Sequence, residues 1–183
     1  HHCKLNFKLP SQKGGEVSWH QDWAFYPHTN DDLITVGVYL EDCYEENGPL
    51  KVIPKSHKMK TFNHHNKNKE FVGKICEKIN LKNKKSLTGK AGTVTFHHVR
   101  TVHGSGLNLK NSKRPLMLFG YTNTDAWPLT YDASVNPNED FEKYNKCIIV
   151  GKKTLVPRFE KIPLIIPLPK KSVSIYQLQK QNK

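Results

Sequence analysis

The chain has 183 residues, of which 36% are hydrophobic, and a formal net charge of +13 at pH 7. This length suits one domain with a real core and is too short for two domains of ordinary size. We therefore expect residues 1–183 to form a single domain. The longest apolar run, "IPLIIPLP", is interrupted by prolines and too short to cross a bilayer, so no membrane partner is expected.

Segments rich in β-branched and aromatic residues follow one another along the chain. They are separated by turn-forming sequences such as "ENGP", "KAG", "GSG" and "LKNSKRP". Many short strands with such punctuation are typical of a sandwich or barrel. The fold class is therefore mainly β with a few short helices, and the expected strands lie within residues 1–10, 16–23, 33–42, 50–55, 92–104 and 115–123.

Three segments depart from this pattern. Residues 58–85 are rich in Lys and Asn and are expected to form a surface insertion, with a short helix near 69–79. Residues 136–147 fit a short helix, with Asn136 as N-cap and Pro137 in the first turn. The tail 157–183 carries repeated prolines and a strand-like "SVSIYQLQ", and we expect it to wrap along the surface or cover a sheet edge.

The cysteines and the basic residues limit the functional classes. Four cysteines without a C-x-x-C pair (Cys3, Cys43, Cys76 and Cys147) suit a reducing cytoplasm, where we expect them to be small buried hydrophobes. Of the 29 basic residues only Arg100, Arg114 and Arg158 are arginines. Nucleic-acid sites favour arginine for bidentate contacts, so we expect no specific nucleic-acid binding.

The sequence "VSWHQDWAFYPH" places two metal-competent side chains two positions apart. In a strand, residues i and i+2 point to the same face, so His20 and Asp22 would lie side by side. Three later histidines in "FHHVRTVHGSG" (His97, His98 and His103) are each able to supply a third ligand. Two histidines and one carboxylate on one face of an octahedron form the site of non-haem Fe(II) oxygenases. A polar pair on a sheet face is the simpler interpretation.

One arginine in this lysine-rich chain follows the last of these histidines. After "HGSG" the chain passes through the turn-forming "LNLKNSK" and returns as "RPLMLFGY", which predicts a reversal that brings Arg114 beside His103 and Ser105. A planar guanidinium next to a hydroxyl is a good receptor for a carboxylate, because it makes bidentate, charge-assisted hydrogen bonds. The plainer interpretation is a surface ion pair of Arg114.

Residues 1–132 resemble the phytanoyl-CoA dioxygenase family of Fe(II)- and 2-oxoglutarate-dependent oxygenases. The resemblance lies in "WHQDWAFYPHTNDDLITVGVYLEDCYEENGPLKVIPKSHK" and "GTVTFHHVRTVHGSGLNLKNSKRPLMLFGYTNTDAWPL", which hold the H-x-D, the distal histidine and the arginine eleven residues later in family order. It implies a double-stranded β-helix, a cupin-like jelly roll whose mouth holds iron. It also implies hydroxylation of a small or acyl-type organic substrate, with O2 as co-reactant and with release of succinate and CO2.

The resemblance also assigns the site. It implies Fe(II) ligation by His20, Asp22 and His103, and binding of the 2-oxoglutarate cosubstrate by Arg114 and Ser105. A ligand role for His97 or His98 is the alternative. Asn6 and Lys8 on the first strand are expected to line the cosubstrate pocket. An intact Asp22 favours hydroxylation over halogenation within this class.

Further features of the family segment carry expectations. Asn47, Gly48 and Pro49 are expected to shape a turn, and Ser56 and His57 to pack near the mouth with a structural role for His57. Lys55 stands where the family often has glycine. Only 19 residues precede His20, so we expect that the family's N-terminal region is missing.

Substrate identity and two other classes stay open. The aromatic segment after the H-x-D motif is expected either to line the mouth or to belong to the core; it includes Trp23, Phe25, Tyr26 and His28. The basic charge is compatible with an anionic substrate such as an acyl-CoA or a phosphonate. A cupin-like metal-binding protein without oxygenase activity would not need Arg114 and Ser105. A non-catalytic jelly roll that binds polyanions would need neither these residues nor the metal ligands.

Overall fold

The structure is a computed structural model that describes residues 2–10, 15–130, 137–169 and 173–180. Its strands are β1 His2–Lys8, β2 Val17–His20, β3 Leu33–Tyr39, β4 Leu50–Val52, β5 Lys85–Leu87, β6 Val94–His98, β7 His103–Ser105 and β8 Arg114–Thr122. Three 3-10 turns are η1 Asp22–Ala24, η2 Glu45–Asn47 and η3 Ser56–Lys58, and the helices are α1 Pro137–Asn145 and α2 Ile175–Lys180.

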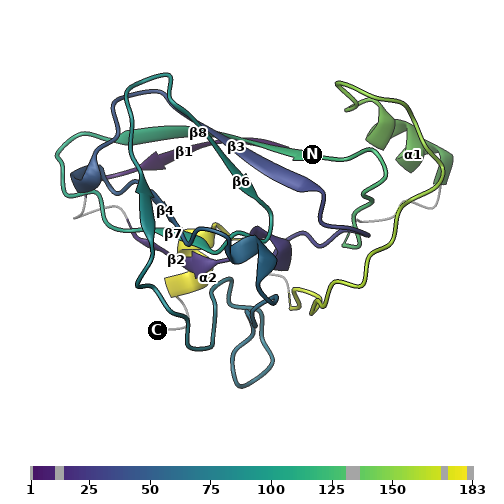
Figure 1. The fold of residues 1–183 in the computed structure, drawn as a ribbon, viewed down its shortest axis with the longest axis horizontal. Helices are drawn as coiled ribbons and strands as arrows, with labels where there is room; N and C mark the ends of the chain where they lie inside the picture. The colour runs from purple at the N-terminus through teal and green to yellow at the C-terminus, as the bar shows by residue number, and fades with distance from the viewer. Residues whose placement is uncertain (1, 11–14, 131–136, 170–172, 181–183) are drawn as a thin grey trace.

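The strands form two four-stranded antiparallel sheets (Figure 1). One sheet has the order β1-β8-β3-β6, and the other has the order β2-β7-β4-β5. The prediction of a mainly β jelly roll with a few short helices is therefore confirmed. In β3, alternate residues are buried, which is the pattern of a strand with one face toward the interior.

The apolar core is divided into two clusters. One cluster joins η1 to β3 through Trp23, Leu33, Val99 and Ala126. The other cluster lies between β3 and β8 and contains Tyr39, Cys43, Leu116 and Leu118. The side chains of a sandwich interior normally form such clusters, and here a cavity also lies between the two sheets.

Several local predictions were wrong. Residues 69–79 form no helix, and "SVSIYQLQ" contains the start of α2 rather than a strand. A reciprocal capping box explains this helix, because Gln177 N donates to Ser174 Oγ and Ser174 N donates to Gln177 Oε1. The short strand β5 was not anticipated. The four cysteines were expected to be buried, but only Cys43 is buried and the other three are exposed.

Two further observations concern helices. The helix predicted over 136–147 is present as α1, which begins at Pro137, whereas Asn136 lies outside the described residues. Within the part of the chain that the structure describes, no helix is both long enough and apolar enough to cross a membrane.

Candidate active site

A cavity of about 640 Å³ opens between the two sheets. Its walls come from the inner faces of both sheets, from residues 25–26 after η1, and from the C-terminal segment 173–178. In Figure 1, α2 lies next to β2, which it contacts, and its residues Ile175, Tyr176 and Leu178 line this side of the cavity. The residues that carry the sequence motifs lie around this cavity, so it is the candidate active site.

Three side chains from separate elements meet on the cavity wall. His20 ends β2, Asp22 begins η1, and His103 begins β7 directly opposite His20 in the ladder. Asp22 Oδ1 lies 3.6 Å from the Nε2 atoms of both His20 and His103. One ligand atom from each of the three residues lies within 4.8 Å of those from the others.

The two imidazoles are oriented for metal binding. His20 Nδ1 lies 2.8 Å from Ser18 O, and His103 Nδ1 lies 2.8 Å from Thr101 O. Because a carbonyl oxygen only accepts, each Nδ1 carries a proton, and in a neutral imidazole of this tautomer the lone pair lies on Nε2, the nitrogen that faces Asp22. Two neutral imidazole nitrogens and one carboxylate oxygen suit a divalent transition metal. The residues present therefore fit Fe(II).

The backbone around Asp22 differs from the sequence prediction, which placed His20 and Asp22 on one face of a single strand. Asp22 belongs to a 3-10 turn rather than to β2, so the turn and not strand alternation brings its carboxylate beside His20. Its second oxygen accepts a hydrogen bond of 3.1 Å from Thr35 Oγ1 and lies 3.6 Å from His97 Nε2. Thr35 on β3 thus leaves Oδ1 directed at His20 and His103.

The charge state of the triad suits a cation. Burial by itself raises the pKa of Asp22, but His103, His20 and His97 together hold the pKa well below its ordinary value. Burial, followed by the nearby His20, lowers the pKa of His103 well below its ordinary value. The site therefore holds an ionised carboxylate and a neutral His103, the protonation states that metal ligation requires.

The two alternative histidines occupy different places. His97 lines the cavity beside the triad, and its ring centroid lies 4.6 Å from that of His103. His98 does not line the cavity and faces Asp31 at 3.9 Å, with the ring of His57 5.4 Å away. Ser56 also lies away from the cavity, where its hydroxyl accepts from Val102 N one residue before His103.

The far end of the cavity presents an anion receptor. Arg114 is 3% exposed and lines the cavity, and its Nε and Nη1 atoms have no hydrogen-bond partner among the residues that the structure describes. Ser105 and Asn6 line the cavity as well. A buried guanidinium with unsatisfied donors favours an anionic ligand, so this chain's residues also fit the distal carboxylate of 2-oxoglutarate.

Lys8 is a second basic residue next to this receptor. It faces Arg114 across the β1–β8 ladder, and its Nζ donates to Ser105 Oγ at 2.7 Å and to Gly106 O at 2.6 Å. Burial, followed by the charge of Arg114, lowers the pKa of Lys8 to about 7. Gly48 leaves room for this lysine, because a Cβ there would lie 2.8 Å from Lys8 Cδ. Gly48 also has φ +65°, as a turn glycine should.

The aromatic segment after the H-x-D motif divides into two groups. Phe25 and Tyr26 line the cavity, whereas Trp23 belongs to the core and His28 is buried elsewhere. Sequence reasoning missed other parts of the cavity wall, namely Thr35, Phe71, Tyr176 and Leu178. A polar residue at an inward position of a strand was a usable signal for Thr35. The others come from segments that meet the cavity only through the tertiary fold.

A jelly roll with two histidines and one carboxylate in its cavity, next to a buried arginine, is typical of non-haem Fe(II)- and 2-oxoglutarate-dependent oxygenases. The family model described as "Phytanoyl-CoA dioxygenase (PhyH)" matches residues 1–116. The chain belongs to the phytanoyl-CoA dioxygenase family.

Similar proteins agree with this assignment. The chain is 42% identical over 178 residues to a "Probable alpha-ketoglutarate-dependent hypophosphite dioxygenase" of Stutzerimonas stutzeri, covering 92% of this chain and 58% of the relative. It is 30% identical over 154 residues to an "L-proline trans-4-hydroxylase" of Streptomyces griseoviridis, covering 69% of this chain and 56% of the relative. The chain thus spans less than two thirds of the length of these relatives.

Solved structures show the same fold. The structure titled "non-heme monooxygenase; ThoJ apo" has a TM-score of 0.62 at 22% identity, covering 72% of this chain and 49% of that one. EctD from S. alaskensis "with 2-oxoglutarate and 5-hydroxyectoine" has a TM-score of 0.53 at 28% identity, covering 68% of this chain and 44% of that one.

Proposed function

We propose that this chain is an Fe(II)- and 2-oxoglutarate-dependent dioxygenase that oxidises a small molecule. The observation that carries the proposal is the pairing of two sites in one cavity: the His20, Asp22 and His103 triad, and the unsatisfied guanidinium of Arg114. A metal-binding protein without oxygenase activity would need only the triad. A polyanion-binding jelly roll would need neither site.

Each residue has a separate task in this proposal. His20, Asp22 and His103 would hold Fe(II) on one face and leave the other coordination positions for cosubstrate and O2. Arg114, Ser105 and Lys8, flanked by Asn6, would bind and orient the distal carboxylate of 2-oxoglutarate. Iron with 2-oxoglutarate and O2 would supply the oxidising chemistry, with release of succinate and CO2. The sheets and α2 would keep bulk water from the reacting centre.

An anaerobic titration tests the proposal. We expect Fe(II) plus 2-oxoglutarate to give the visible metal-to-ligand charge-transfer absorption of a chelated keto acid. Asp22→Ala should remove this band and abolish succinate release, whereas the exposed Glu46→Ala serves as an acid-to-alanine control that keeps both. Iron binding without the band would favour the metal-binding alternative, and succinate release by Asp22→Ala at the wild-type rate would contradict the ligand assignment.

The anion receptor is tested separately. Arg114→Lys keeps the charge but loses the bidentate fork, so we expect 2-oxoglutarate affinity to fall about 10- to 100-fold while iron affinity is kept. Arg100→Lys is the matched control, because Arg100 does not line the cavity. Unchanged 2-oxoglutarate affinity in Arg114→Lys would place the carboxylate elsewhere.

The relatives suggest which substrates to test first. Their names include hypophosphite, L-proline and ectoine, all of them small molecules, and hypophosphite belongs to the relative with 42% identity. We infer that O2 and a molecule of this size are the partners of the chain. Four free cysteines, three of them exposed, support a reducing compartment such as the cytoplasm.

A further inference from the structure

Helix α2 brings a tyrosine into the wall of the cavity. Ile175, Tyr176 and Leu178 line the cavity, and the helix contacts β2. Leu178 is buried, and a Cβ on Gly73 would lie only 2.7 Å from its Cδ2 atom. Leu178 therefore packs directly on the backbone of Gly73, and this packing holds the helix that presents Tyr176.

Tyr176 lies at the end of the cavity that holds the anion receptor. A Cβ on Gly15 would lie 3.4 Å from Tyr176 Cδ1, so the tyrosine ring packs against the backbone of Gly15. Lys8 Nζ donates to Gly15 O at 3.4 Å, and Lys8 is aligned with Arg114 in the β1–β8 ladder. Gly15 therefore connects the tyrosine ring to the basic residues of the receptor.

The hydroxyl of Tyr176 makes no hydrogen bond with any residue that the structure describes. Burial raises the pKa of Tyr176 above its ordinary value, and the charge of Arg114 opposes this rise. The guanidinium thus acts on the phenol, but it gives the phenol hydrogen no acceptor, because arginine only donates. An anion that reaches Arg114 would supply this acceptor.

The donors at this end of the cavity match the acceptor sites of one carboxylate. Arg114 contributes Nε and Nη1, which have no partner in the part of the chain that the structure describes. Ser105 Oγ accepts from Lys8 Nζ at 2.7 Å, so its own hydrogen is left to donate. Tyr176 contributes the phenol hydrogen. An ionised carboxylate accepts at about four lone-pair sites, so the tyrosine brings the number of donors level with the number of acceptor sites.

We propose that Tyr176 is a binding residue for the cosubstrate, and that its hydroxyl donates to the distal carboxylate of 2-oxoglutarate beside Arg114 and Ser105. This inference rests on the proposed function, since it concerns the cosubstrate of the same site. It gives α2 a second role. The helix lines the cavity and also contributes a hydrogen-bond donor to the bound ligand.

A pair of keto acids tests the inference in the anaerobic protein loaded with Fe(II). 2-Oxoglutarate carries the distal carboxylate, whereas 2-oxopentanoate has a methyl group in its place and keeps the chelating carboxylate and keto group. Tyr176→Phe removes only the hydroxyl, so we expect 2-oxoglutarate affinity to fall about tenfold, because a hydrogen bond to a charged group is lost. The affinity for 2-oxopentanoate should be the same in Tyr176→Phe and in wild type. The charge-transfer band measures both affinities.

Tyr121→Phe is the matched control, because Tyr121 on β8 is 40% exposed and does not line the cavity. This variant should bind both keto acids as wild type does. Wild-type 2-oxoglutarate affinity in Tyr176→Phe would overturn the role of the hydroxyl. An equal loss of affinity for both keto acids would also overturn it, because Tyr176 would then only support the cavity wall. A wild-type protein that gives no charge-transfer band with 2-oxoglutarate would overturn the proposed function, and this inference with it.

Discussion

At the scale of single residues, the structure explains why three arginines occur in a lysine-rich chain. Arg100 Nη1 bonds Asp31 at 3.0 Å. Arg158 bonds three acids at once, namely Asp32, Asp125 and Glu160. Arg114 lines the cavity, and it has no acid partner in the part of the chain that the structure describes. A planar guanidinium can bond several partners at once, whereas lysine presents a single point charge.

Lys8 should make cosubstrate binding depend on pH. Its pKa is lowered to about 7, so the ammonium loses its proton as pH rises through neutrality, and the Arg114 receptor then loses its second positive charge. We expect 2-oxoglutarate affinity to fall by up to about tenfold from about pH 6 to about pH 8. The anaerobic charge-transfer band measures this affinity.

A methionine at the same position isolates this effect. Lys8→Met keeps the length of the side chain but does not titrate, and it leaves His20, Asp22 and His103 unchanged. The pH dependence that wild type shows and Lys8→Met lacks therefore belongs to Lys8. Identical slopes in the two proteins would exclude Lys8 from cosubstrate binding.

The candidate site was largely predictable because its residues are marked by local sequence. The H-x-D motif, the histidine before "GSG" and a lone arginine eleven residues later each have a recognisable pattern. Thr35 was missed because threonine is common in β-strands, so its presence in a strand does not by itself indicate a functional role. Only the ladder that aligns Thr35 with His97 shows that both face Asp22.

At the scale of elements, Lys55 has a left-handed backbone conformation just before η3. Its φ of 65° and ψ of 5° are values that glycine favours. A non-glycine residue in this region is strained by roughly 1 kcal/mol. Lys55→Gly should therefore raise the free energy of unfolding by up to about 1 kcal/mol.

Urea denaturation measures this difference, and Lys58→Gly is the control. Lys58 ends η3, outside the positive-φ region, so glycine there should lower stability by about 0.5–1 kcal/mol. If Lys55→Gly were destabilised to the same degree, the left-handed backbone at Lys55 would carry no strain.

Gln179 fixes α2 to the rest of the protein. Its Oε1 accepts from Ser18 N at 2.8 Å, and its Nε2 donates to Gly73 O at 2.6 Å in a buried position. Gln179→Ala leaves two backbone groups unsatisfied, so the free energy of unfolding should fall by about 1–3 kcal/mol. Lys180→Ala, an exposed change in the same helix, should change it by less than about 0.5 kcal/mol. Equal effects in urea denaturation would show that α2 is not held by this side chain.

The strands were easier to predict than the segment that covers the cavity. Enrichment in β-branched and aromatic residues between turn signals marked β3 and β8, whereas α2 lay in a sequence whose β-branched residues also favour a strand. The S-x-x-Q capping box of Ser174 and Gln177 was present but was overlooked. That α2 borders a cavity formed by β1, β2 and β7 follows from contacts distant in sequence, which periodicity does not reveal.

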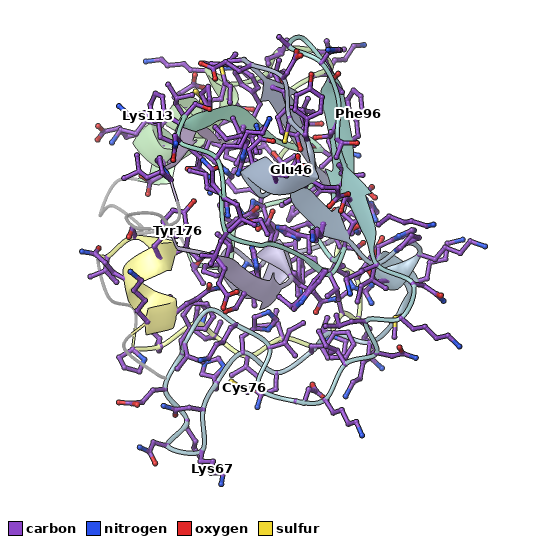
Figure 2. The ribbon with its side chains drawn as sticks, turned by 90° about the vertical axis from the view of Figure 1, so that its left-hand side faces the viewer. Glu46, Lys67, Cys76, Phe96, Lys113 and Tyr176 are labelled. Atoms are coloured by element: carbon purple, nitrogen blue, oxygen red, sulfur yellow. The ribbon has the colours of Figure 1, made fainter. Side chains whose placement is uncertain are left out.

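At the scale of the whole molecule, the positive charge is spread rather than gathered at one surface. Lys67 and Lys113 lie at opposite ends of the molecule in Figure 2, and the lysines that pair with acids are scattered as well, for example Lys60 with Glu77 and Lys90 with Asp42. A dispersed charge attracts polyanions weakly and without a defined footprint.

This distribution of charge predicts weak, salt-sensitive binding of polyanions. We expect retention on heparin at about 0.05 M salt that is lost by about 0.3 M, because few phosphates or sulfates are contacted together. Saturating Fe(II) and 2-oxoglutarate should not change the elution, since the cavity takes no part. Retention beyond about 0.5 M salt, or an elution position that shifts when Fe(II) and 2-oxoglutarate are bound, would instead indicate a defined polyanion-binding site. The polyanion-binding alternative would then regain support, because the net charge of +13 would serve a binding surface rather than being dispersed over the molecule.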